Sequence, residues 1–462
     1  METSASTYTS GLSCMAALAL SLSGTAPSRA QEPQRPNFIV ILADDMGWAD
    51  LGADGSHIET PNLDRMAREG LKFTRFYAMA AMCSPSRAAL LSGRYPQSVG
   101  VPELCNPEVR NGLPMLHLDL NALTIPEALK QHGYTSMLAG KWHLGDEPEY
   151  WPRRHGFAEF WGSLLGTPRY WNPRKTYHNE TPVEADGYFT DRITDQAVEF
   201  ISENRGQPFF LFLSYNAPHW PLEAPQDLID KYSRIFDDEQ FAVYAAQIGC
   251  MDAGIGKVFE TLRETGLDKN TFVFFSSDNG PSPEGSTGKG YGLKGARVSA
   301  GPLREHKFSA FEGGIRVPAL AWWPGHIRAG SSTGRVACLF DLFPTYMELL
   351  GAASGTELHG SSLIPLLDGK QRDIHGDLHW EDALMWAAQR GKWKLVGRFW
   401  EPDPYLYDLK NDIGEEHNLA MKHPAVVKRL SRLHREWQRK TYPDPFPRET
   451  QERPAYQFPQ NN

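Results

Sequence analysis

The sequence predicts an α/β fold with a large, mainly parallel mixed sheet flanked by helices, followed by a smaller C-terminal α+β domain that carries an antiparallel sheet. Two observations predict the large sheet. Four short stretches are continuous apolar runs, typical of strands buried on both faces: residues 38–42, 209–213, 272–275 and 319–323. Between them, apolar residues recur at helical spacing in residues 191–204 and 241–262. Buried strands that alternate with amphipathic helices indicate a parallel sheet.

Helix boundaries carry their usual sequence signals. Thr60-Pro61 opens a helix that Gly70 ends. Thr124 and Glu127 have the spacing of a capping box, in which the two side chains satisfy each other's backbone N–H groups at a helix start. We therefore expect one helix after each of these two sites.

The pattern changes after about residue 365. Residues 384–399 alternate loosely, 405–409 resemble a short strand, and a helix is expected from Pro424 to about Lys440. The tail is rich in proline and polar residues, and we expect it to be poorly ordered. The expected divisions are a signal peptide, a large domain, an α+β domain and the tail: residues 1–30, 31–365, 366–445 and 446–462.

The first 30 residues have features of a signal peptide. Residues 15–22 form a short apolar core, and Ser28-Arg29-Ala30 fits a small-x-small cleavage site, although no basic segment precedes the core. We expect export to the periplasm or the extracellular space; a misplaced start codon is the alternative. No other stretch approaches the roughly 18–20 apolar residues that span a bilayer, so no stable membrane insertion is expected.

The composition argues against several other classes of protein. With 41% hydrophobic and 22% charged residues, the chain resembles an ordinary globular protein. A net charge of −9 without an evident basic face argues against nucleic acid as a partner. The five cysteines include no Cys-x-x-Cys pair, which argues against a zinc ribbon and a thioredoxin-like motif and leaves at most one disulfide open.

The most informative stretch is Cys83-Ser84-Pro85-Ser86-Arg87. Proline is favoured at the first helical position, so Ser84-Pro85 predicts a helix start with Cys83 at its positive end, where anions are stabilised. Arg87 lies four residues on and therefore on the same helix face. Taken alone, Cys83 is equally well explained as a buried small hydrophobic residue.

Carboxylates follow two of the predicted strands. Asp44-Asp45 comes directly after the first apolar run, and Asp278-Asn279 follows the third. Ligands of open α/β sheets bind beyond the carboxyl ends of the strands. Three carboxylates and an amide are hard oxygen ligands, which suit calcium or magnesium rather than zinc. The alternatives are a solvated turn at Asp44-Asp45 and a tight turn at Asn279-Gly280.

Three further loops carry basic side chains. Lys141 and His143 follow the strand-like residues 135–139, and both point to one face if the segment is extended. His219 lies between two prolines in a loop after the second apolar run, and Lys307 lies shortly before a Gly-Gly turn. An exposed lysine, a core histidine and a histidine packed in a turn are the alternative interpretations.

These blocks, in this order, resemble type I sulfatases of the alkaline phosphatase superfamily. The similarity runs over about residues 36–419 and is most specific at residues 83–94, 140–145 and 312–318. Residues 319–327 are most similar to arylsulfatase A and N-acetylgalactosamine-6-sulfatase relatives. The resemblance implies an alkaline-phosphatase-like fold, with the large domain as the catalytic domain.

The resemblance also implies a modified residue and a metal ion. Cys83 would be oxidised by a formylglycine-generating enzyme to formylglycine, which acts as the nucleophile and as a metal ligand. Asp44, Asp45, Asp278 and Asn279 would bind one calcium ion.

The remaining candidate residues would act on the nucleophile and the substrate. Arg87 would stabilise the aldehyde hydrate, and His143 would orient it. Lys141 and Lys307 would hold the sulfate oxygens, and His219 would protonate the leaving alcohol.

The implied reaction is hydrolysis of a sulfate monoester on a sulfated carbohydrate, through a formylglycine hydrate and a covalent sulfate hemiacetal, to alcohol and inorganic sulfate. One alternative is a phosphoester or phosphonate monoester hydrolase of the same superfamily, although the oxygen-only ligand set disfavours a two-zinc phosphatase. Another is a non-catalytic protein that binds sulfated glycans; intact Cys83, Arg87 and His219 argue against it.

Overall fold

The computed structural model of this chain describes residues 7, 9, 35–105, 116–283 and 299–442. The whole predicted tail at 446–462, and all of the predicted signal peptide except residues 7 and 9, lie outside the described residues. The predicted division near residue 365 stays a prediction.

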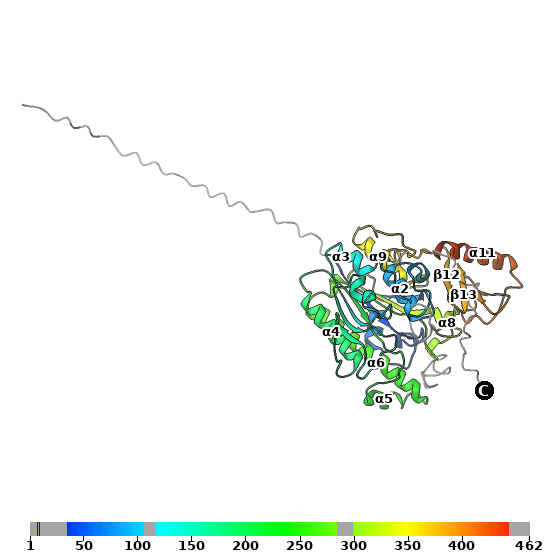
Figure 1. Cartoon of the computed structure of the whole chain (residues 1–462), viewed down its shortest axis with the longest axis horizontal. Coiled ribbons are helices and arrows are strands. Elements are labelled where there is room, and N and C mark those ends of the chain that lie inside the picture. Colours follow the sequence, from blue (N-terminus) through cyan, green and yellow to red (C-terminus); the bar gives the residue numbers. More distant parts are fainter. Residues whose placement is uncertain (1–6, 8, 10–34, 106–115, 284–298, 443–462) are drawn as a thin grey trace, which may run out of the picture. The chain divides into compact units, whose positions relative to one another are not determined.

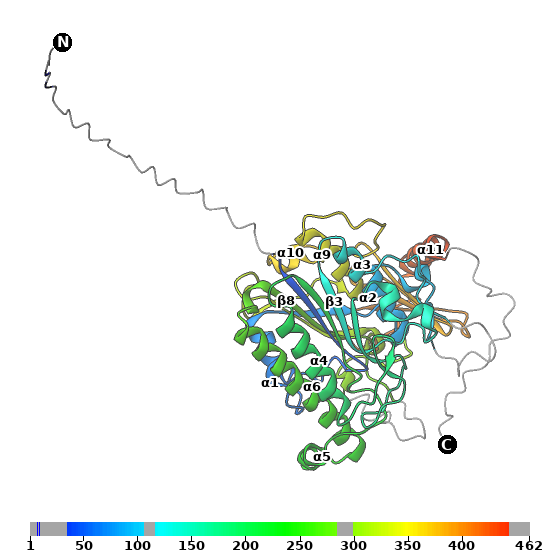
Figure 2. The same ribbon diagram turned by 60° about the vertical axis from the view of Figure 1, so that its left-hand side comes forward.

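Within the described residues, a mixed sheet of eleven strands forms the centre of the fold (Figures 1 and 2). The strand order is β10-β2-β9-β8-β1-β7-β3-β4-β5-β6, with β11 also paired to β2. The five strands from β8 to β4 in this order run parallel, whereas β9, β5 and β6 pair antiparallel. The strands are β1 Asn37–Ala43, β2 Leu71–Tyr77, β3 Thr135–Lys141, β4 Glu159–Ser163, β5 Thr176–His178, β6 Thr181–Pro182, β7 Phe209–Ser214, β8 Thr271–Ser277, β9 Arg316–Trp322, β10 Ser331–Thr333 and β11 Ala337–Cys338.

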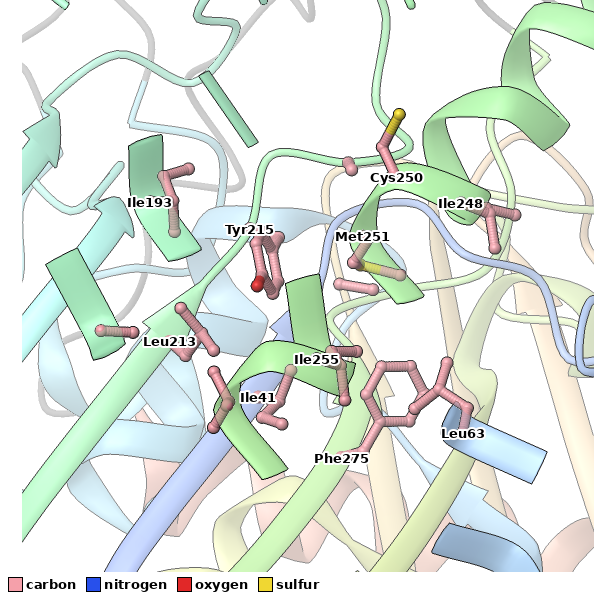
Figure 3. Packing of buried hydrophobic residues seen from close by; sticks show 14 of the residues in the cluster. Ile41, Leu63, Ile193, Leu213, Tyr215, Ile248, Cys250, Met251, Ile255 and Phe275 are labelled. Carbon is pink, nitrogen blue, oxygen red and sulfur yellow. The ribbon is translucent and has the colours of Figure 1, made fainter. Parts of the chain in front are cut away.

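Helices cover both faces of this sheet, and alternate residues of β1 point to the two sides. Ile39 and Ile41 pack in a cluster with α1, α4, α5 and α6, part of which is drawn in Figure 3. Phe38 and Val40 pack in a second cluster with α2, α3, α9 and α10. The helices are α1 Pro61–Glu69, α2 Cys83–Ser92, α3 Ile125–Lys130, α4 Phe189–Glu203, α5 Gln226–Tyr232, α6 Glu239–Glu264, α8 Glu312–Ile315, α9 Leu342–Leu349, α10 Ile364–Leu367 and α11 Pro424–Thr441.

The predicted class and most of the predicted elements are confirmed. The four apolar runs form β1, β7, β8 and β9, all fully buried. The capping box exists as expected, since the Thr124 side chain accepts a hydrogen bond from the Glu127 N–H and the Glu127 carboxylate accepts one from the Thr124 N–H. β2 was not predicted because its buried residues are interrupted by half-buried polar ones, so no continuous apolar run marks it.

The C-terminal region contains a four-stranded antiparallel sheet, as the sequence predicts. One face of it packs through Trp380, Val396 and Tyr407 on residues from β2, β11 and α2. The other face packs through Leu395 and neighbouring residues on α11. Its strands are β12 Leu378–Glu381, β13 Met385–Arg390, β14 Trp393–Arg398 and β15 Tyr405–Asp408.

A buried ion cluster joins this sheet to β2, α8 and β9. Lys394 of β14 has no exposed surface, and its Nζ lies 2.8 Å from Glu312 and 3.0 Å from Glu415. The Tyr77 hydroxyl donates to Glu312 over 2.9 Å, and Arg316 lies 3.3 Å from the same carboxylate. Burial alone would lower the pKa of Lys394, but the two glutamates raise it, so the amine stays charged.

Replacing Lys394 by methionine should destabilise the protein by about 3–5 kcal/mol, because the buried Glu415 then loses its cation and Glu312 keeps only Arg316. Urea unfolding of the purified variant measures this loss. Lys392→Met is the matched control in the turn that precedes β14, since Lys392 is 44% exposed and pairs with Asp408. An ion pair with an exposed lysine of this kind contributes about 1 kcal/mol or less. Equal losses in the two variants would contradict the role of the cluster.

Candidate active site

The candidate site lies at the carboxyl ends of four neighbouring parallel strands. Asp44 follows β1, Lys141 ends β3, Asp278 follows β8, and His219 lies in the loop after β7. Parallel strands present their carboxyl ends at one edge, so these side chains meet although they lie far apart in the sequence.

Cys83 is the first residue of α2, as the Ser84-Pro85 helix start predicts. Its side chain is buried. Burial raises the pKa of the Cys83 thiol, an effect that Lys141 opposes only in part. A buried, protonated thiol is a poor nucleophile. The unmodified side chain is therefore not the activated cysteine of a thiol enzyme.

Arg87, one helical turn on, joins three strand ends. Its Nε and one terminal nitrogen both lie 2.9 Å from Asp278 Oδ2. The other terminal nitrogen donates to Ser214 Oγ over 2.6 Å and to the Lys141 carbonyl over 3.1 Å. Ser214 was missed from the sequence; its only signal is its position as the last residue of β7.

Four oxygen-bearing side chains converge beside Cys83. One ligand atom each of Asp44, Cys83 and Asp278 lie within 4.8 Å of one another, and the Asn279 amide donates to Asp45 Oδ1 over 2.6 Å. Asp44 Oδ1 and Asn279 Oδ1 are buried and have no hydrogen-bond donor in the part of the chain that the structure describes. Buried acceptors are normally paired, so two unpaired oxygens in this cluster fit a cation that they would bind.

The charges of Lys141, Lys307 and Arg87 balance those of the three carboxylates at Asp44, Asp45 and Asp278. Lys141 Nζ lies 2.5 Å from Asp44, and Lys307 Nζ lies 2.8 Å from Asp45. Burial would raise the pKa of Asp44, but Lys141 holds it well below its usual value. Burial and the nearby Asp44 raise the pKa of Asp278 to about 7. The protein's own cations therefore do not fully offset the repulsion between the carboxylates.

The backbone changes conformation between Lys141 and His143, although both side chains lie in the site. β3 ends at Lys141, and His143 has a φ of 61°, so the segment is not extended through both residues. The His143 Nδ1 nevertheless lies 3.3 Å from Cys83 Sγ. A Cβ on Gly166 would lie 2.4 Å from the His143 Nε2, so this glycine leaves the space that the ring occupies. Burial, followed by Lys141, lowers the pKa of His143 well below its usual value, which keeps the ring neutral.

His219 is held in one tautomer. Its Nδ1 lies 2.6 Å from the Trp220 carbonyl, which can only accept, so Nδ1 carries the proton in the neutral ring. Nε2 then accepts from Lys307 Nζ over 3.1 Å and lies 3.4 Å from Asp45. Burial, followed by Lys307, lowers the pKa of His219 to about 4.

The structure brings all the predicted site residues into one buried cluster: Asp44, Asp45, Cys83, Arg87, Lys141, His143, His219, Asp278, Asn279 and Lys307. The tight hairpin turn considered for Asn279-Gly280 does not occur, because the Gly280 N–H donates to the distant Gly314 carbonyl. The four cysteines among the described residues are free, so no disulfide forms there.

Comparisons with known proteins agree with this geometry. The family model described as Sulfatase matches residues 36–352, and the one described as N-sulphoglucosamine sulphohydrolase, C-terminal, matches residues 305–441. N-acetylgalactosamine-6-sulfatase of Homo sapiens is 38% identical over 399 residues, which cover 80% of this chain and 72% of that protein. Arylsulfatase A of Bos taurus is 33% identical, with coverages of 87% and 85%. The crystal structure of Ps i-CgsB in complex with k-i-k-neocarrahexaose superposes with a TM-score of 0.78 at 31% identity and covers 88% of this chain and 93% of that one.

Proposed function

The chain belongs to the sulfatase family and is a sulfuric ester hydrolase, and from that premise we propose that it removes sulfate from a sulfated carbohydrate at the Cys83 cluster. The observation that carries the proposal is the meeting of Cys83, at the start of α2, with Asp44 and Asp278 within 4.8 Å. A helix start, a crowded carboxylate set and three cations form a site for an anionic ester and a divalent metal.

We assign the metal as one calcium ion, held by Asp44, Asp45, Asp278 and Asn279 together with the modified Cys83. The two unpaired oxygens of Asp44 and Asn279 support this assignment. When bound, calcium supplies positive charge where the sulfuryl oxygens become more negative. Because the protein's three cations only balance its three carboxylates, the ion would leave the site with the net positive charge that an anionic substrate requires.

We assign formylglycine to Cys83, produced by a formylglycine-generating enzyme. The modified residue would supply a geminal diol, that is, one hydroxyl group for attack on sulfur and a second for the release of sulfate. His143, 3.3 Å from the Cys83 sulfur, is placed to orient that diol. Arg87 anchors Asp278 and stabilises the negative charge that forms beside it.

Lys141, Lys307 and His219 act on the ester. The two lysines are charged, buried and free to donate to sulfate oxygens, since an ammonium group has three N–H donors. His219 Nε2 accepts from Lys307 and carries no proton in the neutral ring, so His219 would act as an acid only after Nε2 is protonated. The negative charge of a bound ester favours that protonation, and Nε2 would then deliver the proton to the leaving oxygen. General acid catalysis of this kind contributes about 10²–10⁴-fold.

We also propose export of the protein, from the signal-peptide features of residues 1–30. Among the helices of the described residues, none combines the length and the hydropathy of a membrane span.

The proposed function is tested first by the mass of the peptide that carries Cys83, taken from protein co-expressed with a formylglycine-generating enzyme. We expect one oxygen in place of the sulfur and two hydrogens. The same preparation should hydrolyse sulfate esters faster than the corresponding phosphate esters. An unmodified thiol without turnover would contradict the proposal, and faster phosphate hydrolysis would favour the phosphoester alternative.

Cys83→Ser should release at most one equivalent of alcohol per protein molecule. A serine hydroxyl can attack sulfur, but the resulting sulfate ester lacks the second hydroxyl that expels sulfate. A burst experiment that counts released alcohol measures this stoichiometry. Sustained turnover by the variant would rule out the hemiacetal route.

Calcium should stabilise the wild-type protein by about 2.7 kcal/mol at a hundredfold excess over its dissociation constant. Thermal denaturation with and without the ion measures the effect. Asp44→Asn should lose most of the calcium-dependent shift, whereas Asp373→Asn, which changes a 70% exposed carboxylate, should keep it. Equal shifts in both variants would place the calcium elsewhere.

A further inference from the structure

The position of the His219 ring depends on the backbone of its own loop. Its Nδ1 donates to the Trp220 carbonyl, and its N–H donates to the Asn216 carbonyl over 2.9 Å. A small shift of this backbone therefore moves Nε2 relative to Lys307 and to the leaving oxygen. A group that holds the loop would control proton delivery.

Tyr170 makes such a contact from the loop between β4 and β5. It has no exposed surface, and its hydroxyl lies 2.9 Å from the Asn216 carbonyl and 2.9 Å from the His219 carbonyl. Both carbonyls are acceptors, so the phenol must be the donor to either one. Burial raises the pKa of Tyr170 well above its usual value, which keeps that proton in place.

Tyr170 is itself fixed by contacts on three sides. Its N–H donates to Glu223 over 2.9 Å, and its carbonyl accepts from the Phe189 N–H over 2.8 Å. Its ring stacks on Tyr188, with 5.4 Å between the ring centroids and 20° between the planes. Glu223 belongs to the same loop as His219, whereas Tyr188 and Phe189 lie at the start of α4, so Tyr170 links the His219 loop to α4.

We propose that Tyr170 is a positioning residue for proton delivery: its hydroxyl holds the backbone at Asn216 and His219 so that the His219 Nε2 faces the leaving oxygen. The proposal rests on the proposed function, in which His219 is the general acid. Tyr170 does not touch the cluster of Cys83 and the carboxylates through its hydroxyl contacts, so it acts through His219.

The test is Tyr170→Phe in the calcium-loaded enzyme that carries formylglycine. With sulfate esters of weakly acidic alcohols, we expect kcat/KM to fall about tenfold, because a misplaced acid loses part of its contribution. With 4-nitrophenyl sulfate, whose leaving group needs little protonation, the loss should stay below about twofold. Tyr188→Phe is the comparison variant, since it removes a hydroxyl that bonds to the same loop at the Glu223 carbonyl and leaves the contacts at Asn216 and His219 in place. It therefore separates a contact at the His219 backbone from a contact elsewhere in the loop.

A second readout does not require turnover. In protein labelled with ¹⁵N-histidine, the ring signals of His219, identified by their absence in His219→Gln, should move in Tyr170→Phe and stay in place in Tyr188→Phe. Unmoved signals in Tyr170→Phe, or an equal loss of kcat/KM for all leaving groups, would overturn the proposal. A wild-type enzyme without sulfatase activity would instead contradict the proposed function, and the histidine signals would still decide whether Tyr170 positions the ring.

Discussion

The repulsion among Asp44, Asp45 and Asp278 is the constraint on which the rest of the site depends. The three carboxylates are fully buried at one sheet edge, where like charges raise one another's cost of ionisation. The protein places one cation against each of them from a different element: Lys141 from β3, Lys307 from the loop before α8, and Arg87 from α2. Moving any one of these elements would leave a buried charge unpaired, which is strongly destabilising.

The same balance explains why the site suits a sulfate ester. Buried cations that only match the carboxylates give no net attraction for an anion. One carboxylate oxygen, Asp44 Oδ1, and one amide oxygen, Asn279 Oδ1, have no donor among the described residues, and a cation could pair both of them. A divalent ion would satisfy both conditions at once, because it would pair the oxygens and give the site a net positive charge.

The sequence predicted the parts of this arrangement that have a local signature. Continuous apolar runs marked the central strands, and polar residues directly after them marked the site, because parallel strands must bring their ends together. Features made by long-range packing had no such signature. In the sequence, Ser214 has no feature that distinguishes it from other residues at strand ends. Lys394 has the pattern of an exposed lysine in an alternating strand, and Tyr170 is an aromatic residue next to Trp171 in a predicted loop. Each depends on a partner far away in the sequence: 127 residues for Ser214, 82 for Lys394 and 49 for Tyr170.

The C-terminal sheet supports the structure of this site, although it contributes none of the side chains assigned to the chemistry. Arg304 donates to the Tyr407 hydroxyl over 3.0 Å and to the Glu415 carbonyl over 2.8 Å, and its own carbonyl accepts from the Gly313 N–H. These bonds hold one side of the loop that carries Lys307, while the Lys307 N–H donates to the Pro281 carbonyl on the other side, two residues after Asn279. A lysine that pairs with Asp45 is therefore placed between the loop that carries Asp278 and Asn279 and the second sheet. Docking of that sheet, which Lys394 secures, is in this way a condition for the charge balance at the first.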